Sequence, residues 1–330
     1  MRVLHTSHIP LPDMRVEKMA TTLKTNGYSN HFLGPKSKQY LGSFDEVHTI
    51  GIGRSLQIVF DRRLHGQWMK RIRKLSPDVI IAHDIVAAKY LIGSNLPVVY
   101  DDREFWSRSI ETKAGRELTP IYRLRSSPFR NMVPFWERKL VSQFPTLVTH
   151  EAVADNHRKL GNWVGVAWNF PLERMVENLE IGGPRNGSVY SGCDFKSGKF
   201  KTHRDMTGLT GFIQFDVICG VTHREMMERL TKYRIGLTPW LPHPVLPFKD
   251  QNRNYEYFHA GLQVIMNEQL HKRFSHCPFV HAFSHYSELK EIIANLPDID
   301  PQEIADYAME HYLWKYNEEV ILKSCELAIS

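Results

Sequence analysis

The chain has 330 residues, which is too long for one small core, and the usual domain size of roughly 100 to 200 residues predicts two domains. Hydrophobic residues make up 42%, charged residues 24% and aromatic residues 11%, a composition that excludes disorder and fibrous structure. No apolar run approaches the roughly 20 residues that cross a bilayer, and the start of the chain reads as a strand rather than a signal peptide. We therefore expect a cytoplasmic protein, associated at most peripherally with the inner membrane surface.

The net charge of +6 is unevenly distributed along the chain. Lys and Arg outnumber Asp and Glu by 25 to 15 through Leu172, and they fall behind by 17 to 21 after it. A basic N-terminal half is expected to face an anionic partner. No recognised nucleic-acid-binding module is present, so nucleic acid is not the partner we predict.

The four cysteines lie far apart without a Cys-x-x-Cys pair, so neither a disulfide framework nor a four-thiolate zinc site is predicted. We expect them to be reduced and buried. One group of residues approximates the spacing of metal ligands on a helix. It consists of His276, Cys277, His281 and His285. Pro278 argues against a helix there, and no metal site is predicted.

Strands and helices alternate along the N-terminal half. A first short strand ends in a loop rich in Pro and His, and the helix after it stops at Asn26-Gly27, a helix C-terminal signal. Strands are predicted at residues 2–7, 28–33, 78–82, 97–100 and 145–150, with helices at 64–75 and 85–92. Apolar strands linked by helices favour a parallel sheet covered on both faces, which is a Rossmann-like layer.

The same alternation restarts after Asn169-Phe170-Pro171. Strands are predicted at 188–192, 211–219, 235–239 and 263–266, with helices at 224–232 and 254–259. We place the hinge near 168–173. The segment 301–327 is predicted to be one long helix, whose stripe of Ile304, Ala308, Tyr312, Tyr316 and Val320 needs a partner surface. Two such domains facing across a cleft bind ligands at the carboxyl ends of their strands.

The segment from Asn252 to Ile265 carries the most information. It reads as a helix after an irregular loop, a glycine stop at Gly261 and a following strand. A helix N-terminus presents free N–H groups and the positive end of a dipole, which suits a diphosphate. Glu256, one turn into the helix, can accept hydrogen bonds from ribose hydroxyls. The alternative is that Glu256 is a solvated helix carboxylate.

This segment resembles the donor-binding element of retaining nucleotide-sugar glycosyltransferases of the two-Rossmann (GT-B) type, the family 4 group. Their common pattern is Asn-Lys-x-x-Glu-Tyr-x-x-Ala-Gly-x-Pro-Val-Ile. The chain matches it at Asn252, Arg253, Glu256, Tyr257, Ala260, Gly261, Val264 and Ile265, with Arg in place of Lys and Gln263 in place of Pro. The earlier glutamate that many of these enzymes carry would fall on Phe248, so it is absent here.

Other matches follow in order along nearly the whole chain. They are residues 13–20 with Asn26-Gly-Tyr, residues 77–84, residues 98–106, residues 148–154 and residues 312–316. The resemblance implies a Rossmann-like acceptor domain at 1–170, a nucleotide-sugar donor domain at 171–300, and a C-terminal helix at 301–330 that crosses back onto the first domain.

The implied activity is hexosyltransferase-type sugar transfer (EC 2.4) from a nucleoside diphosphate, UDP- or GDP-linked, to a glycan, lipid-linked or other acceptor. The transfer is expected to retain the anomeric configuration and to need neither a cofactor nor a metal. Two alternatives stay open. One is a sugar-nucleotide epimerase or hydrolase of the same fold, and the other is a catalytically silent binding or assembly protein.

The resemblance also implies which residues hold the donor. Cations are expected near the diphosphate, and Lys196 and Lys199 follow the first strand of the second domain, with Arg253 in support. The alternative is that both lysines are surface residues beside a Ser-Gly turn. The full predicted donor set is Gly192, Lys196, Lys199, Asn252, Arg253, Tyr255 and Glu256.

The predicted catalytic set is Arg103, Asp102, His83 and Asp84. Arg103 lies where relatives carry a His or Arg that contacts the transferred sugar, and a permanent cation holds an oxygen rather than moving a proton. Its acidic neighbours can instead be ion-pair partners. His83 and Asp84 end a buried strand and are candidates for orienting the acceptor hydroxyl, although a satisfied core histidine is the more common fate of such a His.

A basic amphipathic helix is predicted over Gln57 to Lys74. It can rest on anionic lipid, as in relatives that modify lipid-linked sugars, or it can pack on the domain with a solvated basic face. The predicted acceptor and surface residues are Arg62, Arg63, Arg71, Arg123 and Arg125.

Overall fold

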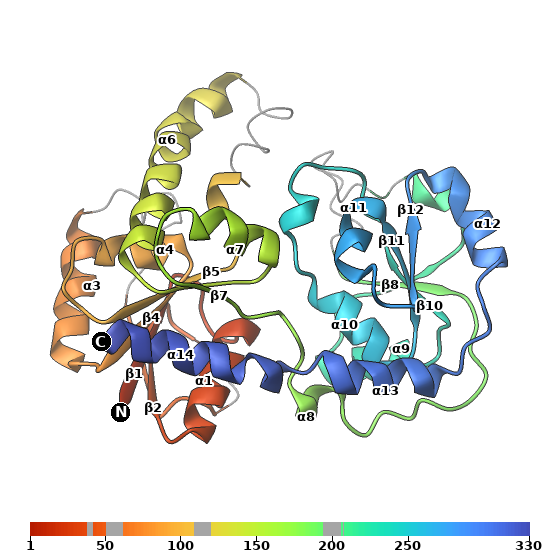
Figure 1. Ribbon diagram of the computed structural model, residues 1–330, viewed down its shortest axis with the longest axis horizontal. Coiled ribbons are helices and arrows are strands. Elements are labelled where there is room, and N and C mark those ends of the chain that lie inside the picture. The colour runs from red at the N-terminus through yellow and green to blue at the C-terminus, as the bar shows by residue number, and fades with distance from the viewer. Residues whose placement is uncertain (38–41, 51–61, 109–119, 194–205, 207) are drawn as a thin grey trace. The chain divides into compact units, whose positions relative to one another are not determined.

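The structure is a computed structural model that describes residues 1–37, 42–50, 62–108, 120–193, 206 and 208–330, without the side chains of 62–63 and 120–131. The chain divides into two compact units (Figure 1). Unit 1 comprises Met1–Trp168 and Asn317–Ser330, and unit 2 comprises Asn169–Tyr316. The boundary after Trp168 lies two residues before the end of the predicted N-terminal domain, 1–170, whereas unit 2 continues past the predicted donor domain, 171–300, to Tyr316.

Unit 1 is built on a seven-stranded sheet in the order β3-β2-β1-β4-β5-β6-β7. The strands are β1 (Arg2–Ser7), β2 (Ser29–Gly34), β3 (Glu46–Thr49), β4 (Val79–His83), β5 (Val98–Asp102), β6 (Thr146–Val148) and β7 (Val164–Val166). All of these pairings are parallel. This is a doubly wound order, in which the direction of strand addition reverses between β1 and β4.

The helices of unit 1 are α1 (Met14–Thr25), α3 (Arg62–Leu75), α4 (Ile85–Ala88), α6 (Pro120–Gln143), α7 (Glu151–Arg158) and α14 (Glu318–Ile329). Helix α1 begins where the Asp13 side chain accepts hydrogen bonds from the backbone N–H groups of Arg15 and Val16. Its apolar residues Val16, Met19, Ala20 and Leu23 are fully buried. The predicted helical spacing after the first strand is thereby confirmed.

The predicted single C-terminal helix is in fact two helices, α13 (Pro301–His311) and α14. They are separated because the backbone N–H of Trp314 bonds to the carbonyl of Pro171, which a continuous helix would forbid. Helix α13 packs on α10 within unit 2, whereas α14 packs on the sheet and on α1 of unit 1 (Figure 1). Only the second helix returns to the first unit.

Unit 2 contains a five-stranded parallel sheet in the order β12-β11-β10-β8-β9. Its strands are β8 (Ser188–Ser191), β9 (Asp216–Ile218), β10 (Ile235–Thr238), β11 (Gln263–Asn267) and β12 (Val280–Phe283). Its other helices are α8 (Glu173–Val176), α9 (His223–Leu230), α10 (Asn252–His259), α11 (Glu268–His271) and α12 (Leu289–Ala294). The strand order reverses between β8 and β10.

The ring of Tyr257 clamps the centre of this second sheet. Its hydroxyl oxygen accepts a hydrogen bond from the backbone N–H of Ser191 at 2.8 Å and donates to the carbonyl of Leu237 at 3.2 Å. The ring lies directly over Gly236, where a Cβ would come within 2.4 Å of ring carbons. Glycine at 236 is therefore required by close approach of α10 to β10.

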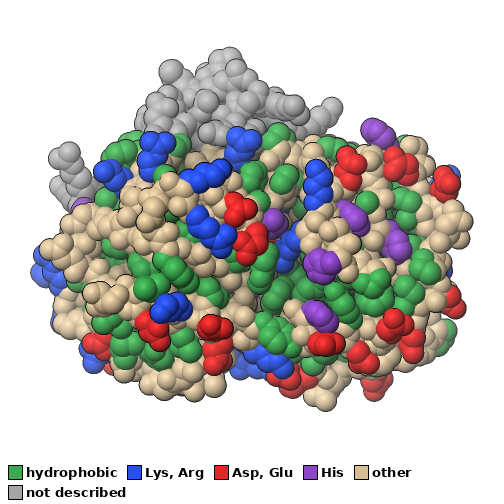
Figure 2. All heavy atoms as spheres, in the orientation of Figure 1, with side chains coloured by type: hydrophobic (Ala, Val, Ile, Leu, Met, Phe, Trp, Pro, Cys, Tyr) green, Lys and Arg blue, Asp and Glu red, His purple; other side chains and the backbone are tan. Residues whose placement is uncertain are grey.

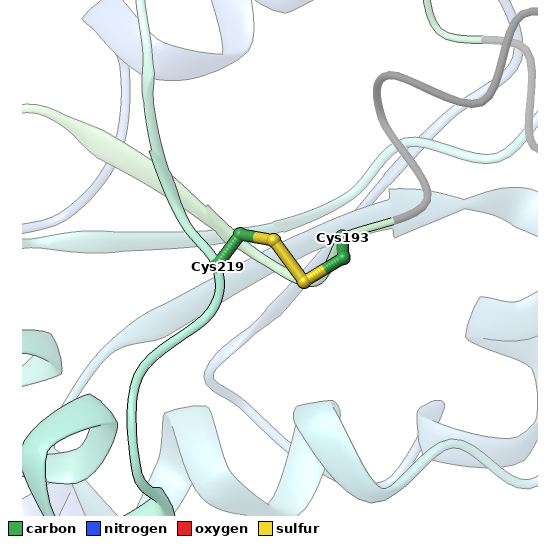
Figure 3. The surroundings of a disulfide bond; sticks show 2 residues. All are labelled: Cys193 and Cys219. Atoms are coloured by element: carbon green, nitrogen blue, oxygen red, sulfur yellow. A yellow bond between two sulfur atoms is a disulfide. The ribbon is translucent and has the colours of Figure 1, made fainter.

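Two of the four cysteines form a disulfide, which corrects the expectation that all four are reduced. Cys193 follows β8 and Cys219 follows β9, and these neighbouring parallel strands bring the two Cα atoms to 5.0 Å (Figure 3). The two cysteines are 26 residues apart in the sequence, on either side of the connection between β8 and β9. Their proximity depends on the pairing of these strands, which the sequence pattern does not show. Cys277 and Cys325 are free and buried, as expected.

Helix α3 packs against unit 1 with its apolar stripe. Leu64, Trp68 and Ile72 are buried, and the indole N–H of Trp68 donates to Thr6 at 2.9 Å. Arg71 and its basic neighbours Lys70, Arg73 and Lys74 are exposed. The described part of this helix is therefore a packed helix with a solvated basic face, so its apolar stripe is unavailable for insertion into lipid.

None of the helices in the described part of the chain combines the length and the apolar character that a membrane crossing requires.

Surface charge follows the asymmetry seen in the sequence. On the face drawn in Figure 2, most Lys and Arg side chains lie over unit 1, while most of the visible histidines lie over unit 2. The N-terminal unit is thus the more basic one on this face.

Several short strands escaped the sequence pattern. β3, β7 and β12 were not predicted, and the strand expected over 211–219 is reduced to β9, with a short helical turn at Leu209–Gly211 before it. All four of these strands lie at the edges of their sheets, and two of them, β3 and β9, consist largely of solvated residues. A solvated edge strand lacks the apolar run that marks an inner parallel strand.

Replacing Gly236 with Ala should destabilise the protein by about 1 to 3 kcal/mol, because the added methyl overlaps the Tyr257 ring and the buried helix has little room to move. Urea unfolding followed by circular dichroism measures the change. Gly211→Ala is the matched control in the same unit, since a Cβ there meets nothing within 4 Å. Equal stability of the two variants would contradict the proposed close packing.

Candidate functional site

The polar side chains of unit 1 gather at the carboxyl ends of β1, β4 and β5. Ser7 of β1 pairs with His83 of β4, and His83 pairs with Asp101 of β5, so the loops that follow these three strands emerge side by side. The strand order reverses between β1 and β4, and the loops on either side of such a point diverge and leave room for a ligand. The candidate site of unit 1 lies here.

Arg103 is the centre of this cluster. Its guanidinium donates to the carboxylate of Asp13 at 2.6 Å and lies 3.8 Å from the carboxylate of Asp84. The Arg103 side chain keeps 12% of its surface exposed, whereas the Asp84 side chain keeps only 3%. Arg103 is therefore the cation that a ligand can reach, and the two carboxylates hold it in position.

Burial raises the pKa of Asp84 to about 7, and the positive charge of Arg103 opposes this rise without cancelling it. Asp84 also occupies an unusual backbone position, with φ at +74°, and its side chain accepts a hydrogen bond at 2.7 Å from the backbone N–H of Ile85, the first residue of α4. For Asp13, burial acts in the same direction, but the nearby Arg103 outweighs it and lowers the pKa. One of the two carboxyls thus titrates near neutral pH.

His8 belongs to the same cluster, although it was not among the predicted site residues. It lies just beyond β1, and burial together with the charge of Arg103 lowers its pKa to about 4. Its Nδ1 atom is buried without a hydrogen-bond partner in the described part of the chain. His8 is hence a neutral imidazole with an available nitrogen at pH 7. The Pro- and His-rich loop after the first strand was the sequence signal for it.

His83 has a different role from the predicted one. Its ring is fully buried, and its two nitrogens contact Asp101 at 2.8 Å and His5 at 3.0 Å. Asp101 is in turn paired with Arg15 at 2.7 Å. Burial lowers the pKa of His83 despite Asp101. His83 is therefore a satisfied core histidine, and it supports the strand ends rather than contacting a ligand.

Asp102 also faces the interior. Its carboxylate accepts a hydrogen bond from His157 Nε2 at 2.7 Å, and Glu137 of α6 lies beside both. Burial alone lowers the pKa of His157, but the hydrogen bond and charge of Asp102 outweigh it and raise the pKa. Burial, followed by the charge of Asp102, raises the pKa of Glu137, whose carboxyl also accepts hydrogen bonds from Ser107. This buried set fastens α6 and α7 to β5.

In unit 2 the corresponding strand-order reversal lies between β8 and β10. Gly192, directly after β8, has φ at +149°, a conformation that favours glycine, and its N–H bonds to the carbonyl of Ile218. The loop after β10 leads to the N-terminus of α10. Since α10 runs back from the carboxyl edge to the start of β11, its first turn lies at this edge, as predicted.

The first turn of α10 presents two half-buried charges on one face. The Arg253 guanidinium lies over the rings of Tyr190 at 4.4 Å and Trp240 at 5.4 Å, measured to the ring centroids. Glu256, one turn later, contacts Nε2 of His223 at 3.1 Å. The Glu256 side chain keeps 13% of its surface exposed. His223, which the sequence analysis missed, therefore positions the carboxylate from the start of α9.

The remaining predicted residues of α10 divide into two groups. Asn252 is exposed at the helix start, where Gln251 provides no side-chain cap. Tyr255 is fully buried among Phe170, Phe274 and Tyr312, and its hydroxyl donates to Asp250 at 2.6 Å. Tyr255 was predicted to bind the donor, and its burial gives it a structural role instead.

Other predicted residues cannot be placed. Lys196 and Lys199 lie outside the described residues. Arg62 and Arg63 fall in α3, and Arg123 and Arg125 fall in α6, but their side chains are likewise outside the described part. Arg71 is exposed on α3. The suspected metal cluster is not helical, since residues 280–283 form β12 and His281 bonds to Gln263 at 2.9 Å.

Comparison with known proteins supports the fold assignment. The chain matches no protein-family model and no curated protein. Among solved structures, it is similar to sucrose-phosphate synthase from Thermosynechococcus elongatus, with 10% identity, 98% of each chain covered and a TM-score of 0.66.

Two further structures extend this likeness. One is WaaG, a glycosyltransferase involved in lipopolysaccharide biosynthesis, with 14% identity, coverage of 97% of this chain and 99% of that one, and a TM-score of 0.65. The other is Anabaena HepE in complex with UDP and glucose, with 12% identity, 99% of each chain covered and a TM-score of 0.63. At such identities the likeness establishes the fold alone, and the predicted GT-B fold is confirmed.

The raised pKa of Asp84 gives a testable pH dependence. Between its ordinary pKa of 3.8 and its folded value of about 7, the native state holds a proton that the unfolded chain has released. The free energy of unfolding should therefore fall as pH rises through this window. Asp84→Asn keeps the α4 cap but lacks this titration. The free energy of unfolding of the variant minus that of wild type should therefore increase by about 1 to 4 kcal/mol from pH 4 to pH 8.

Denaturant unfolding at several pH values measures this difference. Asp155→Asn is the matched control, because Asp155 is exposed on α7 in the same unit. Parallel pH curves for wild type and Asp84→Asn would show that Asp84 titrates normally.

Proposed function

We propose that the protein is a glycosyltransferase that moves a sugar from a nucleoside diphosphate to an acceptor, with unit 2 binding the donor and unit 1 the acceptor. The observation that carries this proposal is the pair of charged clusters at the strand-order reversals of the two GT-B sheets, one around Arg103 and one around Arg253 with Glu256. Ligands of open parallel sheets bind at such points.

The donor side of the proposal rests on α10. The uncapped first turn offers backbone N–H groups to a diphosphate, and Arg253 adds a positive charge beside them. Because the Arg253 guanidinium is stacked on the rings of Tyr190 and Trp240, it has few orientations available. Binding of a diphosphate therefore costs little conformational entropy at this side chain. Glu256, held by His223, accepts hydrogen bonds from ribose hydroxyls. Lys196 and Lys199 remain predicted partners of the diphosphate.

The similar structures support a proposal about the nature of the donor. HepE is described in complex with UDP and glucose, and a trehalose-6-phosphate enzyme from E. coli is described with UDP-2-fluoro glucose. We therefore propose a UDP-linked hexose rather than a GDP-linked one. Transfer with retention, family 4 membership and independence of a catalytic metal are proposed on the sequence resemblance to that family.

On the acceptor side, Arg103 binds an oxygen of the transferred sugar or its phosphate. The acceptor oxygen forms a bond to the anomeric carbon while the bond from that carbon to the phosphate oxygen breaks. Negative charge grows on the departing diphosphate, fixed cations stabilise it, and the proton of the acceptor hydroxyl passes to the departing phosphate oxygen. The neutral imidazole of His8 accepts a hydrogen bond from the acceptor hydroxyl and orients its oxygen toward the anomeric carbon. Asp84 and Asp13 act as positioning residues for Arg103.

A donor panel followed by mass spectrometry tests this function. UDP- and GDP-sugars are incubated with the full chain, with and without candidate glycan and lipid-linked acceptors. Transfer that requires an acceptor is the expected result. Release of free sugar would instead indicate a hydrolase, a changed nucleotide sugar would indicate an epimerase, and binding without turnover would indicate a catalytically silent protein.

Glu256→Gln should weaken the binding of the nucleotide sugar by about 1 to 3 kcal/mol, because a charged hydrogen-bond acceptor is lost while the side-chain shape is kept. Arg103→Lys, in the other unit, should lower the rate of transfer more than it weakens donor binding, since Lys cannot reproduce the planar contacts of Arg with the transferred sugar or its phosphate. Calorimetry measures donor affinity, and initial rates measure transfer.

Glu225→Gln on the exposed face of α9 is the control for charge in unit 2, since Glu225 pairs with Arg229 in solvent. Unchanged donor affinity in a folded Glu256→Gln variant would remove this carboxylate from the donor site.

A further inference from the structure

Two neighbouring strands at the edge of the unit 1 sheet carry a group of metal-ligand side chains. Glu46 and His48 are two residues apart on β3, so they project from the same face of the strand, and His31 projects beside them from β2. The alternate residues Phe32 and Val47 pack into a hydrophobic cluster on the other face. The three polar side chains are thus brought together by strand register rather than by sequence proximity.

The three ligand atoms lie at distances that suit a zinc ion. His31 Nδ1 lies 3.5 Å from Glu46 Oε2 and 3.5 Å from His48 Nε2, and His48 Nε2 lies 3.2 Å from Glu46 Oε2. Zinc binds nitrogen and oxygen ligands at about 2.0 to 2.2 Å, so the edges of its coordination tetrahedron measure about 3.3 to 3.5 Å. One ion can therefore contact all three atoms with little movement.

A second group of side chains orients His31 as metal-bound histidines are usually oriented. The Nε2 atom of His31 contacts the hydroxyl of Ser29 at 3.3 Å, and that hydroxyl donates to the carboxylate of Asp45 at 2.8 Å. A hydrogen bond at one ring nitrogen directs the lone pair of the other toward the metal. The chain from Asp45 through Ser29 does this for His31 Nδ1.

We propose that His31, Glu46 and His48 bind one Zn²⁺ ion, with water as the fourth ligand. The Glu46 side chain keeps 61% of its surface exposed, so water can reach the remaining position. Arg71 of α3 is a nearby positive charge, and the carboxylate of Glu46 offsets it. Two imidazoles and one carboxylate favour zinc over magnesium or calcium, which prefer oxygen ligands.

The position of this site indicates a structural role. His31 pairs with Leu4 of β1, three residues before the end of that strand, which corresponds to about 10 Å along the sheet from the carboxyl edge. The ion is therefore separate from the cluster around Arg103 and takes no part in the proposed transfer. It ties β2 to the edge strand β3, whose residues are all exposed or half-buried.

Equilibrium dialysis of the untagged full chain against Zn²⁺ with a competing chelator tests the proposal. Wild type should bind one ion at this site, and His48→Ala and Glu46→Gln should each weaken its binding at least about tenfold. Ser29→Ala should weaken it about tenfold, the smaller end of the effect of removing an orienting partner. Glu46→Gln should fold as wild type does, because the Glu46 side chain is exposed.

His65→Ala is the control variant, since it removes an exposed histidine from α3 of the same unit. It should bind zinc as wild type does. Replacement of Zn²⁺ by Co²⁺ should produce the absorption bands of a tetrahedral site in wild type and not in His48→Ala. Wild type that binds no zinc, or His48→Ala and Glu46→Gln variants that bind it as tightly as wild type, would overturn the proposal.

Discussion

The parallel pairing of the strands determines where this protein can place reactive groups. All strand pairings among the described residues are parallel, so all carboxyl ends of a sheet lie along one edge. The direction of strand addition reverses between β1 and β4 in the first sheet and between β8 and β10 in the second. The loops that follow the two strands of each pair therefore diverge. Charged and polar side chains collect at these two points, where the diverging loops leave room for a ligand beside the strand ends.

Burying charge at these edges is tolerated only because each charge has a partner. Asp101 is fully buried, and although burial raises its pKa, Arg15 and His83 together lower it well below its ordinary value. Arg103 is held in the same way by Asp13 and Asp84. Removing one partner would leave an uncompensated charge at low dielectric. The network therefore fixes the direction of the Arg103 guanidinium before any ligand binds.

In unit 2, the aromatic side chains of Tyr255 and Tyr257 anchor α10 to the rest of the unit. Tyr257 connects α10 to β8 and β10, while Tyr255 connects it to the loop at Asp250, which also pairs with Arg273. The disulfide between Cys193 and Cys219 joins the ends of β8 and β9 beside Gly192. The N-terminal part of α10 that is not fully buried carries Asn252, Arg253 and Glu256, and how these side chains are presented depends on packing rather than on helix propensity.

Much of the fold was predictable from the sequence, because inner parallel strands are apolar throughout and helices carry their own stop signals. The apolar run at 78–82 and the glycine stop at Gly261 correctly located β4 and the end of α10. The resemblance to family 4 glycosyltransferases, together with the predicted strand and helix ends, pointed to Arg103, Asp84, Arg253 and Glu256, which the structure places in charged clusters.

Tertiary structure alone decided which polar residues are available and which distant residues meet. His83, Asp102 and Tyr255 have the same local pattern as accessible site residues, and only the packing around them shows that they are buried and paired. The break between α13 and α14, the bond between Cys193 and Cys219, and the group of His31 with Glu46 and His48 depend on contacts between segments far apart in the chain. Local sequence determines secondary structure and its periodicity, whereas strand order and register, which set these contacts, are properties of the folded chain.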